Sequence, residues 1–418
     1  MSLFGDGTPI IIDDNVIDPD NTAYQPTELP ERQSELGDLN MVIRPVRTGG
    51  SPHNALVYGP TGQGKTVGVD LKMNQLKEWA EENDQDISVI NVRCKGCGNS
   101  YNVLSLLLKQ LREIQLGKGI EEPKGYTRKA LINMIFEEID SIGGTVIIVL
   151  DEIDGIGEDD YALYELTRPD LEDASVSVIG ITNDTQFRQN LDADVQSSLG
   201  KREVYFNPYN ANQLRDILAR RAAGALIDTH FEGEEQTYDN LESDVLESGV
   251  IPLVAALAGD ETGDARDAIE LFQHTCEYGE ANDEMIREDH VRIMQRKLEK
   301  NAVREQIEAE STQRKLALAS VIKHELDGND SPGTNEIYKT YCTFTDSFEK
   351  RNLSQRTVLQ KLNDLNHSNI LSKQTRSRGK AKGVSNFYSV AVDMELAIEA
   401  LEESQNLADV AVVLRELQ

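Results

Sequence analysis

The segment GPTGQGKT, residues 59–66, constrains the fold of this 418-residue chain more than any other. It follows a short apolar run, Ala55–Tyr58, and precedes a stretch of helical periodicity, Lys65–Glu82. Its glycines allow successive backbone N–H groups to face one anion, and the helix N-terminus adds a positive partial charge. The lysine is placed to reach the outer phosphates, and the final threonine offers a hydroxyl to Mg²⁺. The loop therefore predicts a nucleoside triphosphate site between a strand and a helix. Its predicted lining is Gly59, Pro60, Thr61, Gly62, Gln63, Gly64, Lys65, Thr66 and Val67.

Polar side chains follow two further apolar runs. Thr145–Leu150 (TVIIVL) is typical of a buried parallel strand, and Asp151 and Glu152 come directly after it. In α/β proteins, ligand sites form at the edge of the sheet where the carboxyl ends of the parallel strands lie. Asp151 is predicted to hold Mg²⁺, directly or through water, and Glu152 to polarise an attacking water. Asn183 follows the run Val176–Ile181 and is predicted to hydrogen-bond the γ-phosphate or that water.

Strands alternate with helices as far as about residue 206, which predicts a parallel sheet covered on both faces. Beyond that point the pattern indicates helices at Ala211–Ala225 and Asp264–Gly279 without strong strands between them, as in a small all-α lid. Arg266 opens the second of these helices, where a lid arginine can contact the γ-phosphate. The remaining runs predict strands at 87–92 and helices at 28–41, 101–115 and 128–139.

The last quarter of the chain has the element order of a winged helix. Three predicted helices, 314–326, 333–348 and 354–367, precede two strand-like runs, 370–374 and 384–390, and an acidic helix, 394–405. A long polar helix, 289–310, is a candidate connector. The domain boundaries that we predict are an extended N-terminal arm at 1–20, a nucleotide-binding domain at 21–206, a lid at 207–300, and the connector with the winged helix at 301–418.

Charge is distributed unevenly along the chain. The formal net charge is −31, and a polyanion of this kind is repelled by DNA. Residues 311–418 nevertheless hold 14 basic and 14 acidic residues, so the whole acidic excess lies before them. A basic cluster without acidic residues extends from the first C-terminal strand-like run into the loop that joins it to the second, and it predicts a DNA-binding patch on an acidic body. The cluster comprises Lys373, Arg376, Arg378, Lys380 and Lys382.

The composition also bears on the cellular environment. An acidic surface is typical of proteins from salt-accumulating microbes, because high salt screens self-repulsion while carboxylates stay hydrated. No apolar run approaches the roughly 20 residues of a membrane span, and no signal peptide is evident, so we expect a cytoplasmic protein without a membrane partner. Cys94 and Cys97 form one CxxC without a second ligand pair, which favours reduced structural thiols and leaves any further role open.

Taken together, these motifs resemble the AAA+ ATPases, and in particular archaeal replication initiators of the origin recognition complex and cell-division-cycle type. The resemblance covers about residues 15–300 well and the C-terminal unit more loosely. In the family's aromatic-proline element, FNPY, Asn207 stands where a proline is common, which changes little. The matching segments are LPERQSEL, GPTGQGKT, LDEID, LYELTR, VIGITND, SSL, FNPY, QLRDILARRA and GDARDAIELF.

The resemblance implies roles for several residues. Arg32 would flank the adenine, and Tyr209 and Arg221 would contact the nucleotide from the lid. Asn183 and Arg266 would be the first and second sensors of the γ-phosphate. Residues 93–115 would form an extra helical element able to touch DNA. Helix 354–367 would lie in or near the major groove with Gln355, Arg356 and Lys361 as candidate contacts, and the basic hairpin would lie along the backbone or minor groove.

Three functions fit this reading. The first is an ATP-switched protein that binds replication origins, recruits the replicative helicase and hydrolyses ATP slowly, with Mg²⁺ as cofactor. The second is a paralogue that regulates transcription or replication from DNA without firing origins. The third is a ring-forming clamp loader or remodeller with rapid turnover, which the basic winged helix disfavours. A ring needs an arginine finger, and the role of Arg202 stays open, as does any contact with other initiator copies.

Overall fold

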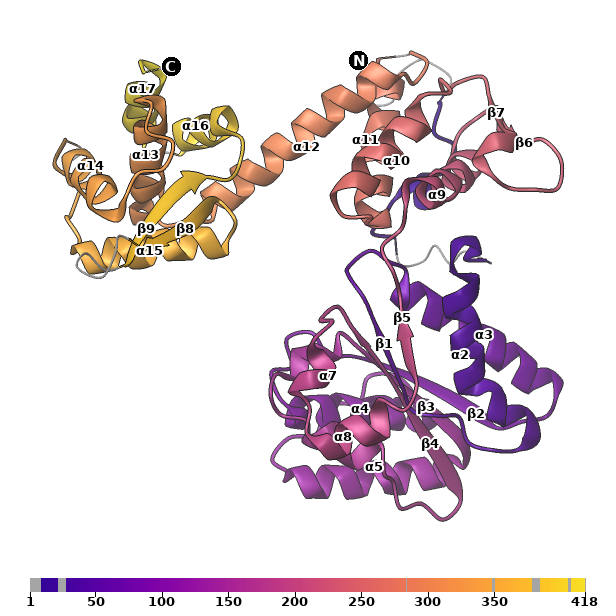
Figure 1. Cartoon of the computed structure of the whole chain (residues 1–418). Helices are drawn as coiled ribbons and strands as arrows, with labels where there is room; N and C mark the ends of the chain where they lie inside the picture. Colours follow the sequence, from indigo (N-terminus) through magenta and orange to yellow (C-terminus); the bar gives the residue numbers. More distant parts are fainter. Residues whose placement is uncertain are drawn as a thin grey trace. The chain divides into compact units, whose positions relative to one another are not determined.

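The computed structural model describes residues 9–21, 28–282, 284–347, 350–377, 384–404 and 407–417. The chain forms two compact units, Met1–Val291 (unit 1) and Arg292–Gln418 (unit 2), which are drawn in Figure 1. Within the described residues, no helix is both long and apolar enough to cross a lipid bilayer.

Unit 1 is built on a five-stranded parallel sheet with the strand order β2-β3-β4-β1-β5. Strand β3 (Gly144–Asp151) contains the predicted TVIIVL run, and its residues from Val146 to Leu150 are all buried. Such a continuous apolar run arises because both faces of a parallel sheet are covered. β5 was not predicted, since three residues are too few to show a pattern. The other strands are β1 (Ala55–Tyr58), β2 (Ile87–Arg93), β4 (Ala174–Thr182) and β5 (Glu203–Tyr205).

Helices cover both faces of this sheet (Figure 1), as the alternating pattern predicted. Side chains of β3 alternate between the two layers, because successive residues of a strand point to opposite faces. Ile147 and Val149 join the core beneath α2 and α3, while Val146, Ile148 and Leu150 join the core beneath α4 and α5. The helices are α2 (Gln33–Ile43), α3 (Lys65–Glu82), α4 (Ser100–Leu116), α5 (Arg128–Ile142), α6 (Tyr161–Leu166), α7 (Phe187–Asn190) and α8 (Ala193–Leu199).

The lid follows β5 and consists of three helices and a small hairpin. α9 (Ala211–Ala225) begins at a capping box, in which Asn210 and Gln213 exchange side-chain to backbone hydrogen bonds. An antiparallel pair, β6 (Thr229–Phe231) and β7 (Leu241–Ser243), adds strands that the sequence pattern did not indicate. The remaining helices are α10 (Val250–Glu261), which was also not predicted, and α11 (Ala265–Ala281).

The described part of the N-terminal arm is folded onto the lid. Asp14–Ile17 form a one-turn helix, α1, so the expectation of an extended arm is wrong for these residues. Ile17 is fully buried, and the Ile12 N–H donates to the Ala225 carbonyl at 2.7 Å. Burying one isoleucine contributes about 1.5–3 kcal/mol, enough to favour a turn that is too short to show a helical period. Residues 1–8 lie outside the described part.

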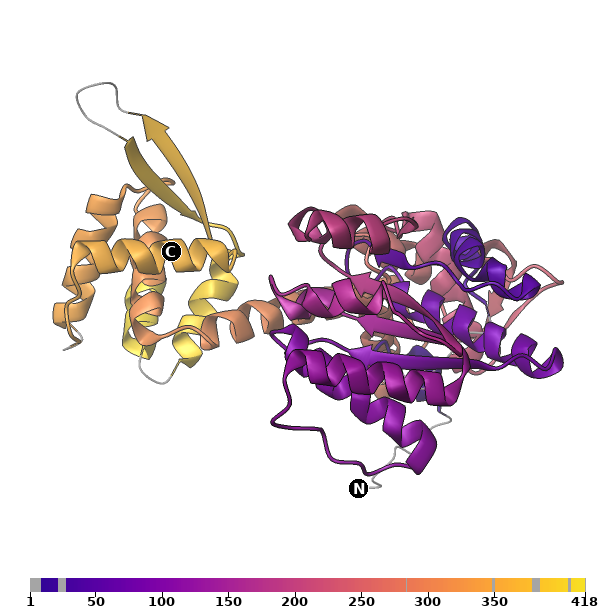
Figure 2. The same cartoon turned by 90° about the horizontal axis from the view of Figure 1, so that it is seen from below.

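Unit 2 has the predicted order of three helices and a hairpin around one core, which includes Tyr341 and Tyr388. Figure 2 shows the β8–β9 hairpin projecting beyond the helices of this unit. Gly333 adds an antiparallel bridge to Phe387 of the hairpin. The last helix, α17, was not predicted. The elements are α12 (Glu288–Glu308), which includes the boundary between the units, α13 (Thr312–Leu326), α14 (Thr334–Ser347), α15 (Gln355–His367), β8 (Leu371–Ser377), β9 (Val384–Val390), α16 (Met394–Glu403) and α17 (Ala408–Arg415).

Candidate functional site

The loop 59–66 adopts a backbone with positive φ at three positions, a conformation that favours glycine. Gly59, Gly62 and Gly64 have φ values of 148°, 64° and 78°, and Gly64 forms the N-cap of α3. A Cβ on Gly59 would lie 2.3 Å from the carbonyl oxygen of Phe206, and one on Gly62 would lie 1.5 Å from Oδ1 of Asp264. The glycines are therefore needed both for the turn and for close contact with the chain that leads into the lid.

Lys65, the first residue of α3, folds back over this loop. Its Nζ donates to the Gly59 carbonyl at 2.9 Å and also to the Pro60 carbonyl. Burial lowers the pKa of Lys65 to about 8, although the carboxylates of Asp151 and Asp264 act in the opposite direction. Loop amides at a helix N-terminus with one lysine ammonium between them suit a polyphosphate. Val67, two residues further along α3, is partly exposed.

Thr66 and Asp151 lie side by side at the end of β3. The Thr66 hydroxyl is 3.3 Å from both carboxylate oxygens of Asp151. Burial raises the pKa of Asp151, and hydrogen bonds from the Glu152 amide and from Thr66 counter this effect. A hydroxyl and a carboxylate are oxygen ligands that suit Mg²⁺, so the residues present fit a magnesium–nucleotide complex.

Glu152 is held by two cations that the sequence analysis did not assign to it. Its carboxylate lies 2.8 Å from Arg93 Nε and 3.4 Å from Lys95 Nζ, and the hydrogen bond from Arg93 lowers the pKa of Glu152. Arg93 ends β2 and pairs in register with Asp151, which explains the contact. The sequence contained a signal for this contact, since β2 and β3 both end in charged residues. Only the pairing of the two strands brings those residues together.

Asn183 lies at the same edge of the sheet. Strand β4 ends at Thr182, which pairs in register with Tyr58, and Gly59 follows Tyr58 directly. The Asn183 side chain is exposed, as a contact with a ligand requires. The hydroxyl of Thr182 donates to Asp154 Oδ1 at 2.7 Å and so ties the end of β4 to the turn after β3.

Arg32 is fully buried between the loop and the lid. Its guanidinium donates to Glu35 at 2.8 Å, to the Asn207 carbonyl at 2.7 Å, and to the carbonyl and side chain of Gln63 at 3.2 Å. It also stacks on Tyr209, with Cζ 3.6 Å from the ring centroid. Arg32 and Tyr209 thus lie beside the loop. Their predicted contacts with the nucleotide stay predictions, and the structure adds a role in joining the loop to the lid.

Asp264, which the sequence analysis did not single out, caps α11 against the loop. One carboxylate oxygen accepts from the Arg266 amide at 2.7 Å, and the other accepts from the Thr61 hydroxyl at 3.1 Å. The Ala265 amide donates to the Gly62 carbonyl at 3.3 Å. The lid helix therefore begins directly on the loop 59–66.

Arg221 and Arg266, the two lid arginines that were predicted to contact the nucleotide, contact the N-terminal segment in this structure. Arg266 forms an ion pair with Asp20, and Arg221 donates to the carbonyl of Val16. Arg266 starts the helix that is capped on the loop, so its predicted role remains compatible with its position. For Arg221, the described contact is with the segment that carries α1.

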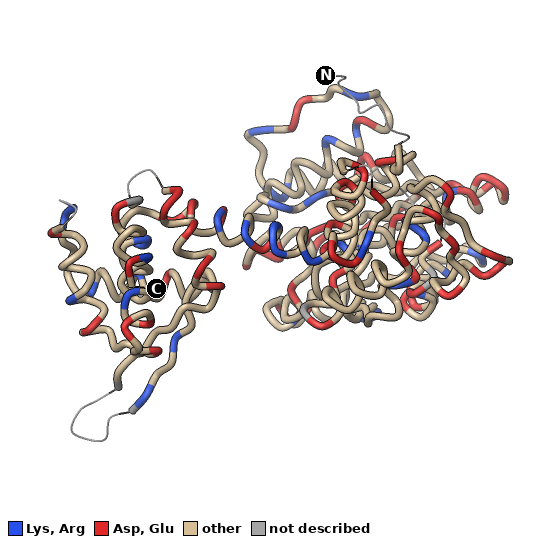
Figure 3. Tube along the Cα trace, turned by 90° about the horizontal axis from the view of Figure 1, so that it is seen from above, with Lys and Arg blue, Asp and Glu red and all other residues tan. Residues whose placement is uncertain are grey.

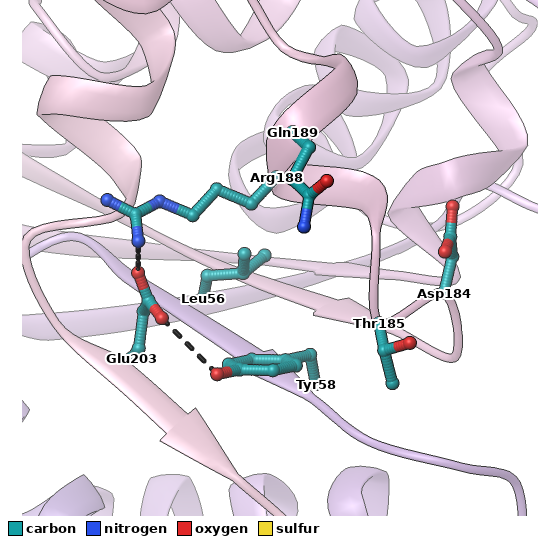
Figure 4. A pocket seen from close by; sticks show the side chains of 7 residues that line it. All are labelled: Leu56, Tyr58, Asp184, Thr185, Arg188, Gln189 and Glu203. Carbon is teal, nitrogen blue, oxygen red and sulfur yellow. Dashed lines mark hydrogen bonds and ion pairs between the residues drawn. The ribbon is translucent and has the colours of Figure 1, made fainter.

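An open cavity of about 170 Å³ lies beside the carboxyl edge of the sheet. Figure 4 shows the Arg188 guanidinium on Glu203, whose other carboxylate oxygen accepts from Tyr58 at 3.3 Å. Leu56, Asp184, Thr185 and Gln189 complete its lining. Since its lining includes no residue of the loop 59–66, this cavity is separate from the predicted phosphate site.

Those predicted DNA contacts that lie in the described residues are on α15 and β8 of unit 2. Gln355 opens α15 and donates to Asn335, Arg356 is exposed, and Lys361 is 3.6 Å from Asp364. Basic residues recur along β8, as the blue segments of the hairpin in Figure 3 show.

The basic side chains Lys373 and Arg376 of β8 are exposed, and each contacts a neighbouring residue. Lys373 donates to Asn363 of α15 at 2.9 Å, which joins the hairpin to that helix. Arg376 donates to Gln374 at 2.8 Å and lies over the ring of Phe387 at 5.0 Å. The other three residues of the basic cluster, Arg378, Lys380 and Lys382, lie outside the described residues.

Comparison with protein-family models matches three segments of the chain. Residues 49–191 match an AAA domain, residues 215–296 a Cdc6 AAA+ ATPase-type lid domain, and residues 305–400 the C-terminal winged helix domain of CDC6. The order of these segments agrees with the elements described above, and the fold is therefore an AAA+ core with a lid and a C-terminal winged helix.

Individual proteins match over nearly the whole chain. ORC1-type DNA replication protein 1 of Haloarcula marismortui is 34% identical, with 98% of this chain and 96% of that protein covered. The ORC1-type DNA replication protein of Thermococcus kodakarensis is 37% identical, with 86% and 83% covered. The Aeropyrum pernix ORC1 protein, solved in complex with DNA, superposes with a TM-score of 0.76 at 32% identity, covering 97% of this chain and 100% of that one. The chain therefore belongs to the ORC1/Cdc6 family of archaeal DNA replication proteins.

Proposed function

We propose that this protein is an ATP-switched replication initiator that binds origin DNA. The observation that carries the proposal is the convergence of Lys65, Thr66, Asp151 and Glu152 at one sheet edge, in a chain that also has a winged helix. These four residues would form a nucleotide switch. The winged helix of unit 2 would supply the DNA-binding surface that the switch controls. The solved relative from Aeropyrum pernix was bound to DNA, which supports the same reading.

The proposed ligand is ATP or ADP with Mg²⁺. The loop amides and Lys65 would hold the phosphates, Thr66 and Asp151 would supply oxygen ligands to the metal, and Glu152 would accept a proton from the attacking water. The two cations on Glu152 stabilise its carboxylate and restrain its position. We expect this restraint of Glu152 to slow ATP hydrolysis. The bound nucleotide would then persist long enough to act as a switch.

The proposed DNA surface is α15 with the β8–β9 hairpin. Phosphate contacts from Lys373 and Arg376 would position the unit, while Gln355 and Arg356 would face base edges in the major groove. Recruitment of the replicative helicase and contact with other initiator copies are further parts of the proposal, and a cytoplasmic location stays a prediction. The relatives' common designation as DNA replication proteins supports this function over a ring-forming remodeller.

The second candidate is a paralogue that regulates transcription or replication without firing origins. It uses the same residues, so genomic position is the observation that separates the two. Binding sites of the protein would be mapped in its host for wild type, for Lys373→Glu/Arg376→Glu, and for Lys77→Glu/Lys118→Glu. The last variant makes the same charge change on exposed lysines of unit 1 and serves as the control.

We expect wild type and control to occupy replication start sites and the hairpin variant to lose them. Occupancy of promoters alone would refute the initiator function and favour the regulator. For the nucleotide site, Lys65→Ala is expected to abolish ATP binding at a salt concentration where circular dichroism shows a folded chain. Unchanged ATP affinity in that folded variant would refute the site.

A further inference from the structure

Gln63 occupies the phosphate-binding loop, yet its side chain is fully buried away from solvent. Its amide uses every hydrogen-bonding position that it has. Oε1 accepts from Arg32 Nη2 at 3.2 Å and from the Tyr209 amide at 3.1 Å. Nε2 donates to the Thr61 carbonyl at 2.8 Å and to the Gly263 carbonyl at 3.1 Å. One side chain thus joins the loop, the Arg32 side chain just before α2 and two points of the lid.

Only an uncharged amide can make this set of contacts. A carboxylate has no hydrogen to donate to the carbonyls of Thr61 and Gly263, and it would be repelled by both. A hydrocarbon of similar size would leave the buried Gly263 carbonyl and the Arg32 guanidinium each short of one partner. Both groups would keep another partner, since the Gly263 carbonyl also accepts from the Tyr209 amide at 3.0 Å and Arg32 Nη2 donates to the Asn207 carbonyl at 2.7 Å. The glutamine amide therefore adds hydrogen bonds to groups that are already partly satisfied, and each one lost lowers stability.

The neighbouring contacts form a continuous seam between the loop and the lid. Thr61 bonds Asp264, Gly62 bonds Ala265, and Gln63 bonds Gly263, so three successive loop residues touch three successive lid residues. We name these six residues the loop–lid seam. Of the three loop residues, only Gln63 also reaches the start of the lid chain, through the Tyr209 amide.

The loop at this seam also holds Lys65. The Lys65 ammonium donates to the carbonyls of Gly59 and Pro60, two residues at the start of the same loop. A phosphate group would compete for that ammonium and for the loop amides, and we expect the loop backbone to adjust when nucleotide binds. A rigid, fully bonded side chain in the middle of the loop carries such an adjustment to its partners.

We propose that Gln63 is the positioning residue that transmits nucleotide occupancy of the loop to the lid. The inference rests on the proposed nucleotide switch and specifies the contact through which it acts. Glutamine contacts no phosphate in this role. Its side chain keeps Gly263 and the Tyr209 amide, the two parts of the lid that it contacts, in fixed positions relative to Thr61 of the loop.

The test compares Gln63→Leu with wild type and with Gln75→Leu, the same change at an exposed position of α3. Two quantities are measured in the full chain: the affinity for ADP with Mg²⁺, and hydrogen exchange of the lid amides at 263–268. The Ala265 amide donates across the seam, so its exchange reports the seam directly. For wild type and Gln75→Leu, we expect ADP to slow this exchange by about tenfold or more.

For Gln63→Leu, with ADP and Mg²⁺ at concentrations that saturate the variant, we expect the change in lid exchange to fall below about twofold. Gln63→Glu, which keeps the bond to Arg32 but loses both donors, should behave in the same way and serves if the leucine variant does not fold. A Gln63 variant that binds ADP and still protects the lid would overturn the inference, as would wild type that binds ADP without protecting it.

Loss of ADP binding in both Gln63 variants would also overturn the inference, because Gln63 would then act on affinity instead of transmission. If wild type itself binds neither ADP nor ATP, the proposed nucleotide switch fails. That outcome is distinct from the others because it appears before any Gln63 variant is compared.

Discussion

Replacing Arg32 by methionine tests the buried polar centre of unit 1. The guanidinium is about 1% exposed and forms an ion pair of 2.8 Å with Glu35, which is about 8% exposed. Methionine fills similar space but leaves the Glu35 carboxylate buried without its cation. Breaking a buried pair in this way costs about 3–5 kcal/mol, so the free energy of unfolding of unit 1 should fall by that amount.

A second substitution separates the charge from the packing. In Arg32→Met/Glu35→Leu the unpaired carboxylate is gone, and we expect a recovery of about 2 kcal/mol relative to the single variant. The carbonyl of Asn207 and the side chain of Gln63 still lack their donor, so full recovery is not expected.

Urea unfolding followed by tryptophan fluorescence suits this measurement. Trp79 is the chain's single tryptophan and lies on α3, so its signal reports unit 1. The loss should be similar at two salt concentrations that both support folding, because a buried pair is poorly screened. A loss below about 1 kcal/mol for Arg32→Met, or no recovery in the double variant, would refute the reasoning.

Three further predictions concern the ligands. Because the pKa of Lys65 is lowered to about 8 and phosphate favours the ammonium form, binding should take up a proton above pH 8. ADP affinity, measured by calorimetry, should therefore fall as the pH rises through 8, and a Lys65→Arg variant that retained this dependence would contradict the assignment. Arg93→Ala should leave Glu152 with only its longer contact to Lys95 and raise the ATP hydrolysis rate severalfold at unchanged ATP affinity, as a phosphate-release assay can show; an unchanged or lower rate would count against restraint by this ion pair. Arg376→Glu should weaken DNA binding about uniformly across sequences and reduce the slope of log K against log salt by about 1, whereas an unchanged slope would exclude a phosphate contact.

The sequence by itself determined the fold class and brought together the main residues of the candidate site. The segment GPTGQGKT between an apolar run and a helical stretch specifies a strand, a glycine-rich turn and a helix, because each depends on local spacing and on glycine conformations. The TVIIVL run and the carboxylates after it are equally local, and the register of β1, β3 and β4 brings their ends together. Both parts of the candidate site, the loop 59–66 and the carboxylates after β3, could be predicted to lie together because the carboxyl ends of parallel strands lie at one edge of a sheet.

Only the tertiary structure decided what surrounds those residues. The pairing of β2 with β3 places Arg93 on Glu152, and no pattern within either strand specifies that pairing. The short elements α1 and β5 were missed for the same reason, since they are stabilised by distant neighbours and are too short to show a period.

The loop–lid seam is the clearest example of contacts that the sequence pattern did not predict. Gln63 was assigned to the nucleotide from its place in the motif, but its side chain is buried on Tyr209 and Gly263, which lie 146 and 200 residues away along the chain. Hydrogen-bond satisfaction of a buried amide depends on partners from every segment that packs around it. Such partners are set by tertiary packing, which local sequence does not encode.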